Sequence, residues 1–189
     1  AQTSLVLVAR AQISTLQEAN RSTGELLEMG IEPALLLING ILPVGAATDQ
    51  LSESIYAREQ ALLDGLATNP ELSAINSIPT VRLELKANPV MGGDGLLHLG
   101  EPDDNESSNA GPALEPGLTQ SVSNSHVDLS NLVDELAEGK PKLVLCMGKG
   151  GVGKTTVAQM LALELAKRGK PVHLSTTDPA NHLDVSLED

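Results

Sequence analysis

The sequence predicts an α/β fold in which a parallel sheet is covered by helices. Short runs of apolar residues alternate along the chain with segments whose apolar residues recur at helical spacing. Continuous apolar strands of this kind are typical of a parallel sheet that is buried on both faces. A glycine-rich segment also lies directly between one such strand and one such helix. Together these observations favour strands and helices in alternation.

The first segment, residues 1–100, is expected to contain three strands and two helices. Apolar runs predict strands at residues 5–9, 34–38 and 78–85. A first helix is expected to start at a capping box, Ser14-Thr15-Leu16-Gln17, and to stop at Gly30. Apolar spacing predicts a second helix over residues 51–66. Three strands make a small sheet, so this segment is expected to be part of a larger one.

The second segment, residues 101–125, has the composition of a flexible acidic linker. It is rich in Pro, Gly, Ser, Asn and acidic residues, and no Lys or Arg occurs from residue 101 to residue 139. An acidic docking tail is the alternative. The third segment, residues 126–189, predicts a helix at 128–138, a strand at 143–147, a helix at 154–168 ended by Gly169 and a strand at 172–176. Strand, glycine loop and helix then follow one another directly.

The glycine loop is Gly148-Lys149-Gly150-Gly151-Val152-Gly153-Lys154-Thr155-Thr156. Glycines let a phosphate approach the backbone, whose N–H groups then converge at the positive end of the following helix. Lys154 adds a charge for the β- and γ-phosphates, and Thr155 offers a hydroxyl to a magnesium ion. The loop therefore predicts binding of ATP or GTP. Lys149 could reach a phosphate across an interface, as an arginine finger does, or be a solvated surface residue.

Composition excludes several classes of function. The net charge of −13 and the single aromatic residue, Tyr56, argue against a nucleic-acid partner. Cys146 is the only cysteine, so no internal disulfide can form, and it is expected to be a small buried hydrophobe. No apolar run approaches the roughly 20 residues of a membrane span. None of the four histidines shows metal-ligand spacing.

The loop resembles the deviant phosphate loop of the ATPases that include the arsenical pump-driving and tail-anchored-protein targeting ATPases. The stretch Ser175-Thr176-Thr177-Asp178-Pro179-Ala180 is similar to the first switch of that branch. Residues 1–100 resemble the end of the first half of the pump ATPase, in the stretches at residues 5–10, 14–18 and 38–43. Residues 126–189 resemble the start of its second half. The resemblance implies a phosphate-loop NTPase, as two partial halves joined by a linker.

The resemblance also implies roles for particular residues. Asp178 would orient the attacking water or the magnesium shell, unless it is only a cap or turn residue. Asn39 would read the adenine of ATP and Pro89-Val90 would pack on it, although Asn39-Gly40 could equally be only a turn. The cysteines that bind the metalloid in the family are absent. A trivalent arsenic site needs about three thiolates, and Cys146 is the only cysteine of the sequence. The metalloid site is therefore expected outside this chain.

The function that the resemblance implies is an ATP- and magnesium-dependent ATPase that drives arsenite or antimonite efflux through a membrane permease. It would be cytoplasmic and peripheral at the inner membrane through that permease. The alternative is an ATPase that targets tail-anchored membrane proteins. A partition or division-site ATPase would want a membrane-binding helix or a basic DNA-binding surface, and the sequence shows neither. Other portions of both halves are expected beyond Ala1 and Asp189, so residues 1–189 alone are expected to be inactive and prone to aggregation.

Overall fold

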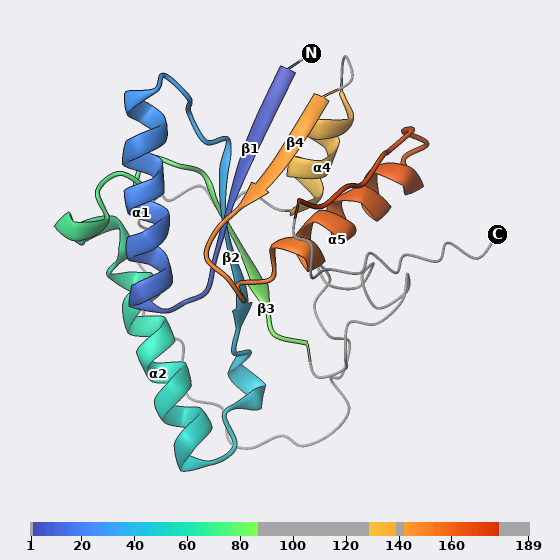
Figure 1. Ribbon diagram of the computed structural model, residues 1–189. Helices are drawn as coiled ribbons and strands as arrows, with labels where there is room; N and C mark the ends of the chain where they lie inside the picture. The colour runs from blue at the N-terminus through green and yellow to red at the C-terminus, as the bar shows by residue number, and fades with distance from the viewer. Residues whose placement is uncertain (1, 87–128, 139–141, 178–189) are drawn as a thin grey trace.

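Four parallel strands form the sheet of the computed structural model, which describes residues 2–86, 129–138 and 142–177 (Figure 1). All neighbouring strands in it are parallel. In chain order they are β1 (Gln2–Ala9), β2 (Leu35–Ile41), β3 (Thr80–Glu84) and β4 (Lys142–Met147). Their order across the sheet is β3-β2-β1-β4. The predicted α/β class with a parallel sheet is therefore confirmed.

The first strand of the chain is an inner strand of this sheet. Val6 of β1 is aligned with Leu35 of β2 on one side and with Cys146 of β4 on the other. Strand β4, which precedes the glycine loop, thus joins the sheet formed by the three strands of the first segment. The assignment of residues 1–100 and 126–189 to two ATPase halves stays a prediction.

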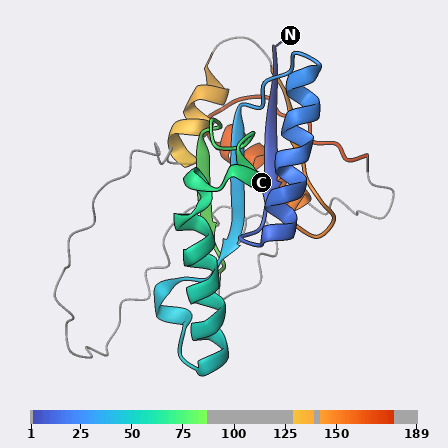
Figure 2. The same cartoon turned by 90° about the vertical axis from the view of Figure 1, so that its left-hand side faces the viewer.

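Helices cover both faces of the sheet, which gives three layers. Helices α1 (Ile13–Glu28) and α2 (Gln50–Asp64) lie on one face, and α4 (Leu129–Ala137) and α5 (Lys154–Lys167) lie on the other (Figures 1 and 2). Short 3₁₀ helices η1 (Val44–Ala46), η2 (Leu66–Thr68) and η3 (Pro70–Leu72) complete the first segment. No helix in the described ranges is both long enough and apolar enough to cross a bilayer.

The alternation of side chains along β1 divides the core into two clusters. Leu5 and Leu7 pack with α1, whereas Val6 and Val8 pack with α4 and α5. All four side chains are at most 5% exposed, and burying such a side chain contributes about 1.5–3 kcal/mol. The buried apolar residues of the described chain are Leu, Val, Ile, Ala and Met, as the near absence of aromatic residues predicts.

Helix α1 ends as predicted but begins differently. The N–H of Gly30 donates to the carbonyl of Leu27, and the N–H of Ile31 donates to that of Leu26, which closes the helix at the expected glycine. The predicted capping box at residues 14–17 is wrong, because the helix already begins at Ile13. Gln12 precedes the helix and its side chain makes no capping hydrogen bond, so Ser14 lies within the first turn instead of capping it.

A capping box does occur at the start of α2, where the sequence pattern did not indicate one. Asp49 accepts a bond from the N–H of Ser52, and the Ser52 hydroxyl oxygen accepts a bond from the N–H of Asp49. Serine replaces the Glu or Gln that the usual pattern contains at this position.

The strand predicted at residues 172–176 is also wrong. Residues 170–177 form neither helix nor strand. A strand needs a neighbouring strand for its backbone hydrogen bonds. Within the described part of the chain, the only partner of β4 is β1, so this segment does not pair with the other edge of β4.

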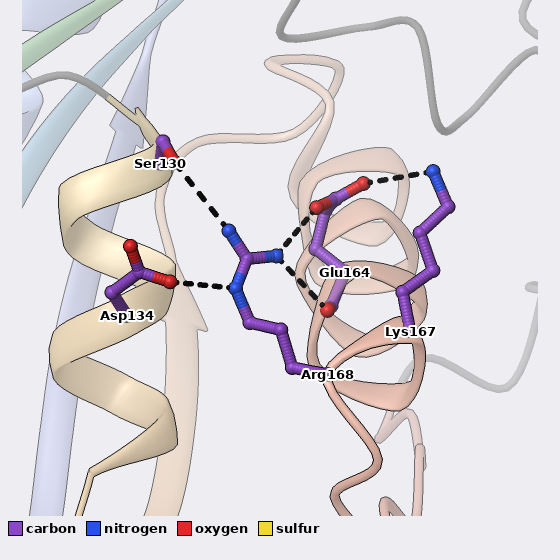
Figure 3. Close-up of polar contacts among 5 residues, drawn as sticks. All are labelled: Ser130, Asp134, Glu164, Lys167 and Arg168. Carbon is purple, nitrogen blue, oxygen red and sulfur yellow. Dashed lines mark hydrogen bonds and ion pairs between the residues drawn. The ribbon is translucent and has the colours of Figure 1, made fainter.

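An ion-pair cluster joins α4 to the end of α5 (Figure 3). Nε of Arg168 donates to Oδ1 of Asp134 at 2.7 Å, and Nη1 donates to Oε2 of Glu164 at 2.6 Å. These two carboxylates raise the pKa of Arg168, and the hydrogen bond that Arg168 donates to Asp134 contributes most. The cluster fixes the end of the helix that follows the glycine loop.

Candidate phosphate-binding site

The glycine loop lies at the carboxyl edge of the sheet, between β4 and α5. On one side of this point β1 connects through α1 to β2, and on the other side β4 connects to α5 on the opposite face (Figure 1). Parallel α/β sheets bind ligands outside the carboxyl ends of their strands, at the place where the connections diverge in this way. The fold therefore places the loop where such a sheet receives a ligand.

Two glycines of the loop allow no side chain. Gly148 has φ 155°, and a Cβ there would collide with the carbonyl oxygen of Val8. Gly153 has φ 94°, and a Cβ there would collide with the amide nitrogen of Asn39. Both glycines are thus required where the loop packs on the ends of β1 and β2.

The outer side of the loop is open. A Cβ at Gly150 or Gly151 would meet no atom within 4 Å. Helix α5 begins at Lys154 with no acidic residue in its first turn, and the first N–H groups of a helix have no partner within the helix. An open glycine backbone next to the positive end of a helix fits a phosphate group.

The two lysines of the loop lie differently. Nζ of Lys154 donates to the carbonyl oxygen of Lys149 at 3.0 Å, so this side chain folds back over its own loop. Lys149 is exposed. The pKa of Glu18 on α1 is lowered chiefly by a hydrogen bond from Arg21, and the charge of Lys149 adds to this effect. The charge of Lys149 thus acts outside the loop, on α1, whereas the side chain of Lys154 stays over the loop.

Thr155 and Thr156 stand in the first turn of α5, each partly buried. This places the hydroxyl of Thr155 on the helix end that follows the glycines, as the loop pattern predicts. Among the residues that the structure describes, no group of three His, Cys, Asp or Glu could hold a metal ion. Asp178, Pro89 and Val90, to which the resemblance gives roles, lie outside the described residues.

Cys146 precedes the loop in β4 and packs against the apolar cluster that includes Val6 and Val8. Burial raises the pKa of its thiol to about 11. The thiol is therefore protonated at neutral pH, whereas a soft metalloid binds thiolates. Cys146 is thus a small hydrophobe that packs against the core, although it is only partly buried and not fully buried as predicted.

Asn39 contacts the loop directly, which the sequence did not indicate. Its amide nitrogen donates to the carbonyl oxygen of Val152 at 3.0 Å. The loop pattern specifies only the residues from Gly148 to Thr156, and Asn39 lies 113 residues before Val152. No local signal could therefore connect them, because the contact depends on the order of the strands.

Comparison with known proteins finds that the chain is similar to ATPases. The profile of the anion-transporting ATPase family matches residues 141–189. The chain is 41% identical over 187 residues to the arsenical pump-driving ATPase of Acidiphilium multivorum and 40% identical over 188 residues to that of Escherichia coli. Each alignment covers 98% of this chain and 30% of the relative. The ATPase GET3 of Malassezia globosa is 47% identical over 55 residues, which cover 29% of this chain and 16% of that protein.

Proposed function

The chain belongs to the family of the arsenical pump-driving ATPases, and from that premise we propose that its glycine loop binds and hydrolyses ATP. The observation that carries the proposal is the loop itself, which joins β4 to α5 with open backbone at Gly150 and Gly151 and with Lys154 folded over it. The chain spans 30% of the length of the two pump-driving relatives, so the activity of the whole protein is part of the proposal.

Backbone and side-chain groups of the loop would bind the phosphates of ATP in different ways. The backbone N–H groups of residues 148–153 and of the first turn of α5 would hold the phosphate oxygens. Nζ of Lys154 would exchange its bond to the carbonyl of Lys149 for the β- and γ-phosphates, which carry more negative charge than a carbonyl oxygen. Both sets of contacts come from one rigid turn between a strand and a helix, which limits the cost of ordering the site.

Magnesium and the reacting water would be held by different residues. Bound magnesium neutralises charge on the β- and γ-phosphates. Thr155 fits as its protein ligand, since its hydroxyl stands on the first turn of α5 and magnesium commonly combines a few protein oxygens with phosphate oxygens and water. We assign Asp178 to the orientation of the attacking water or of the magnesium shell, as the Thr-Asp-Pro-Ala stretch indicates. Pro89 and Val90 would pack against the base.

We assign to the whole protein the role of driving arsenite or antimonite efflux through a membrane permease. The two pump-driving relatives align with nearly the whole of this chain, including the residues before the loop. The alternative is targeting of tail-anchored membrane proteins. The GET3 relative matches less than a third of the chain, which favours the pump. The protein would act in the cytoplasm and reach the membrane through the permease, and the metalloid would bind other residues than Cys146.

The replacement Lys154→Ala in the complete gene product tests the central assignment. It removes the charge that faces the phosphates, so we expect weaker ATP binding and a loss of turnover on the order of 10²-fold or more. Titration calorimetry and a phosphate-release assay measure the two quantities. Lys170→Ala is the matched control, because Lys170 is an exposed lysine just beyond α5. Unchanged binding and turnover in Lys154→Ala would refute the proposed site.

A further inference from the structure

The contact between Asn39 and the glycine loop joins two parts of the sheet that are not neighbours. Asn39 stands near the end of β2, and β1 separates β2 from β4. The loop crosses the end of β1, where Gly148 packs on the carbonyl of Val8, and Asn39 then bonds to Val152 at its far end. The loop is thus supported at both of its ends by strands of the first segment.

The backbone of β2 is irregular at this position. The register of β2 against β3 shifts between Asn39 and Ile41, and the guanidinium of Arg10 covers the intervening Gly40. Irregularities of this kind re-aim a side chain and are frequent beside functional sites. Here the side chain concerned is Asn39, which is partly buried on the face of the sheet that carries α5.

The bond fixes the orientation of one peptide group in the loop. The carbonyl and N–H of a trans peptide point in opposite directions. When Asn39 holds the carbonyl of Val152, the N–H of Gly153 must point to the opposite side. The side chain of Val152 is 1% exposed and packs in the core, and this packing also holds its peptide group in place. The glycine loop can then present this N–H without first ordering it.

We propose that Asn39 is a positioning residue that holds the glycine loop in the form that accepts a triphosphate. The inference rests on the proposed function of the loop. It differs from the role in reading adenine that the resemblance implies, because a positioning residue acts on every ligand that carries the phosphates. A residue that reads the base acts only on ligands that carry adenine.

Inorganic tripolyphosphate separates the two roles, because it carries the phosphates and no base. We expect Asn39→Ala in the complete gene product to weaken binding of magnesium tripolyphosphate, ATP and GTP by the same factor, about 5- to 10-fold, as for the loss of one hydrogen bond. Asn20→Ala is the matched control. Asn20 also bonds to backbone, at the N–H groups of Ala74 and Ile75, but in a different part of the fold. The control should bind all three ligands as the wild type does.

The result that would overturn the inference is a loss of ATP affinity with unchanged affinity for tripolyphosphate, which would make Asn39 a base-reading residue. Unchanged affinity for all three ligands would overturn both roles. If Asn39→Ala does not fold, Asn39→Leu decides, since it keeps about the same size, removes the donor and adds no charge. Wild-type protein that binds neither ATP nor tripolyphosphate would instead refute the proposed function.

Discussion

At the scale of single residues, the two lysines of the loop have different surroundings. Lys154 is bonded to the carbonyl of Lys149 within the loop, so its charge already lies where phosphates would bind. Lys149 is exposed, and its charge acts on Glu18 of α1. A charge at the outer side of the loop can serve a phosphate that another domain or subunit holds.

The replacement Lys149→Ala is therefore expected to lower turnover more than affinity. Loss of a charge that acts only as negative charge develops in the transition state should lower kcat by roughly 10²-fold or more and leave ATP affinity nearly unchanged. Single-turnover kinetics and calorimetry on the complete gene product measure the two effects. Glu18→Gln is the control, because it removes the nearby carboxylate and keeps the lysine. Equal losses of affinity and turnover would show that Lys149 binds phosphate in its own site.

At the scale of elements, the glycine loop depends on the helices that follow and flank it. Arg168 at the end of α5 bonds to Asp134 and, more weakly, to Ser130, both on α4, and to Glu164 one turn earlier in α5 (Figure 3). Its side chain is 25% exposed. This cluster and the apolar contacts of α4 with α5 hold the phosphate-loop helix against the sheet.

Arg168→Ala is expected to destabilise the protein by about 1 kcal/mol or less, because solvent screens such partly exposed ion pairs. The midpoint of urea unfolding, followed by circular dichroism, measures the change. Lys167→Ala is the matched control, because among the described residues Lys167 pairs with Glu164 alone, at 3.3 Å, and is 49% exposed. It should shift the midpoint less than Arg168→Ala does. An equal shift in both variants would show that the link to α4 contributes nothing.

Local patterns predicted most elements but not every terminus. The buried strands and the glycines that end α1 and α5 follow from neighbouring residues, and the structure has them. The start of α1 could not be found from a capping pattern, because Gln12, the residue before the helix, makes no side-chain capping bond. The segment at 172–176 has the composition of a strand, but composition does not decide whether a segment pairs with an open edge of the described sheet such as that of β4.

At the scale of the whole molecule, the sheet combines strands that are distant in sequence. β1 pairs with β2 and β4, whereas β3 and β4 each have one partner among the described strands. The glycine loop could be identified from its own residues, since its pattern is local. The support that it receives from Val8 and Asn39 could not, because it follows from strand order, which apolar patterns leave open.

Native-state hydrogen exchange tests this arrangement. Amide protons of Leu5–Val8 should exchange more slowly than those of β3 and β4, because they lie in an inner strand that is at most 5% exposed. Their protection should approach that of global unfolding, as measured by mass spectrometry of peptides from the complete gene product. Fast exchange in β1 with slow exchange in β4 would contradict the order β3-β2-β1-β4.

The inner position of β1 has a consequence for synthesis on the ribosome. Gln2 pairs with Lys142, so β1 emerges about 140 residues before its partner, which at 5–20 residues per second is a delay of roughly 7 to 28 s. During this interval β1 can pair with β2 but not with β4, so the edge that β4 occupies in the folded protein lacks that partner. We therefore expect the nascent chain to be prone to wrong strand pairing, and to fold better with chaperones, until the strand before the glycine loop has been made.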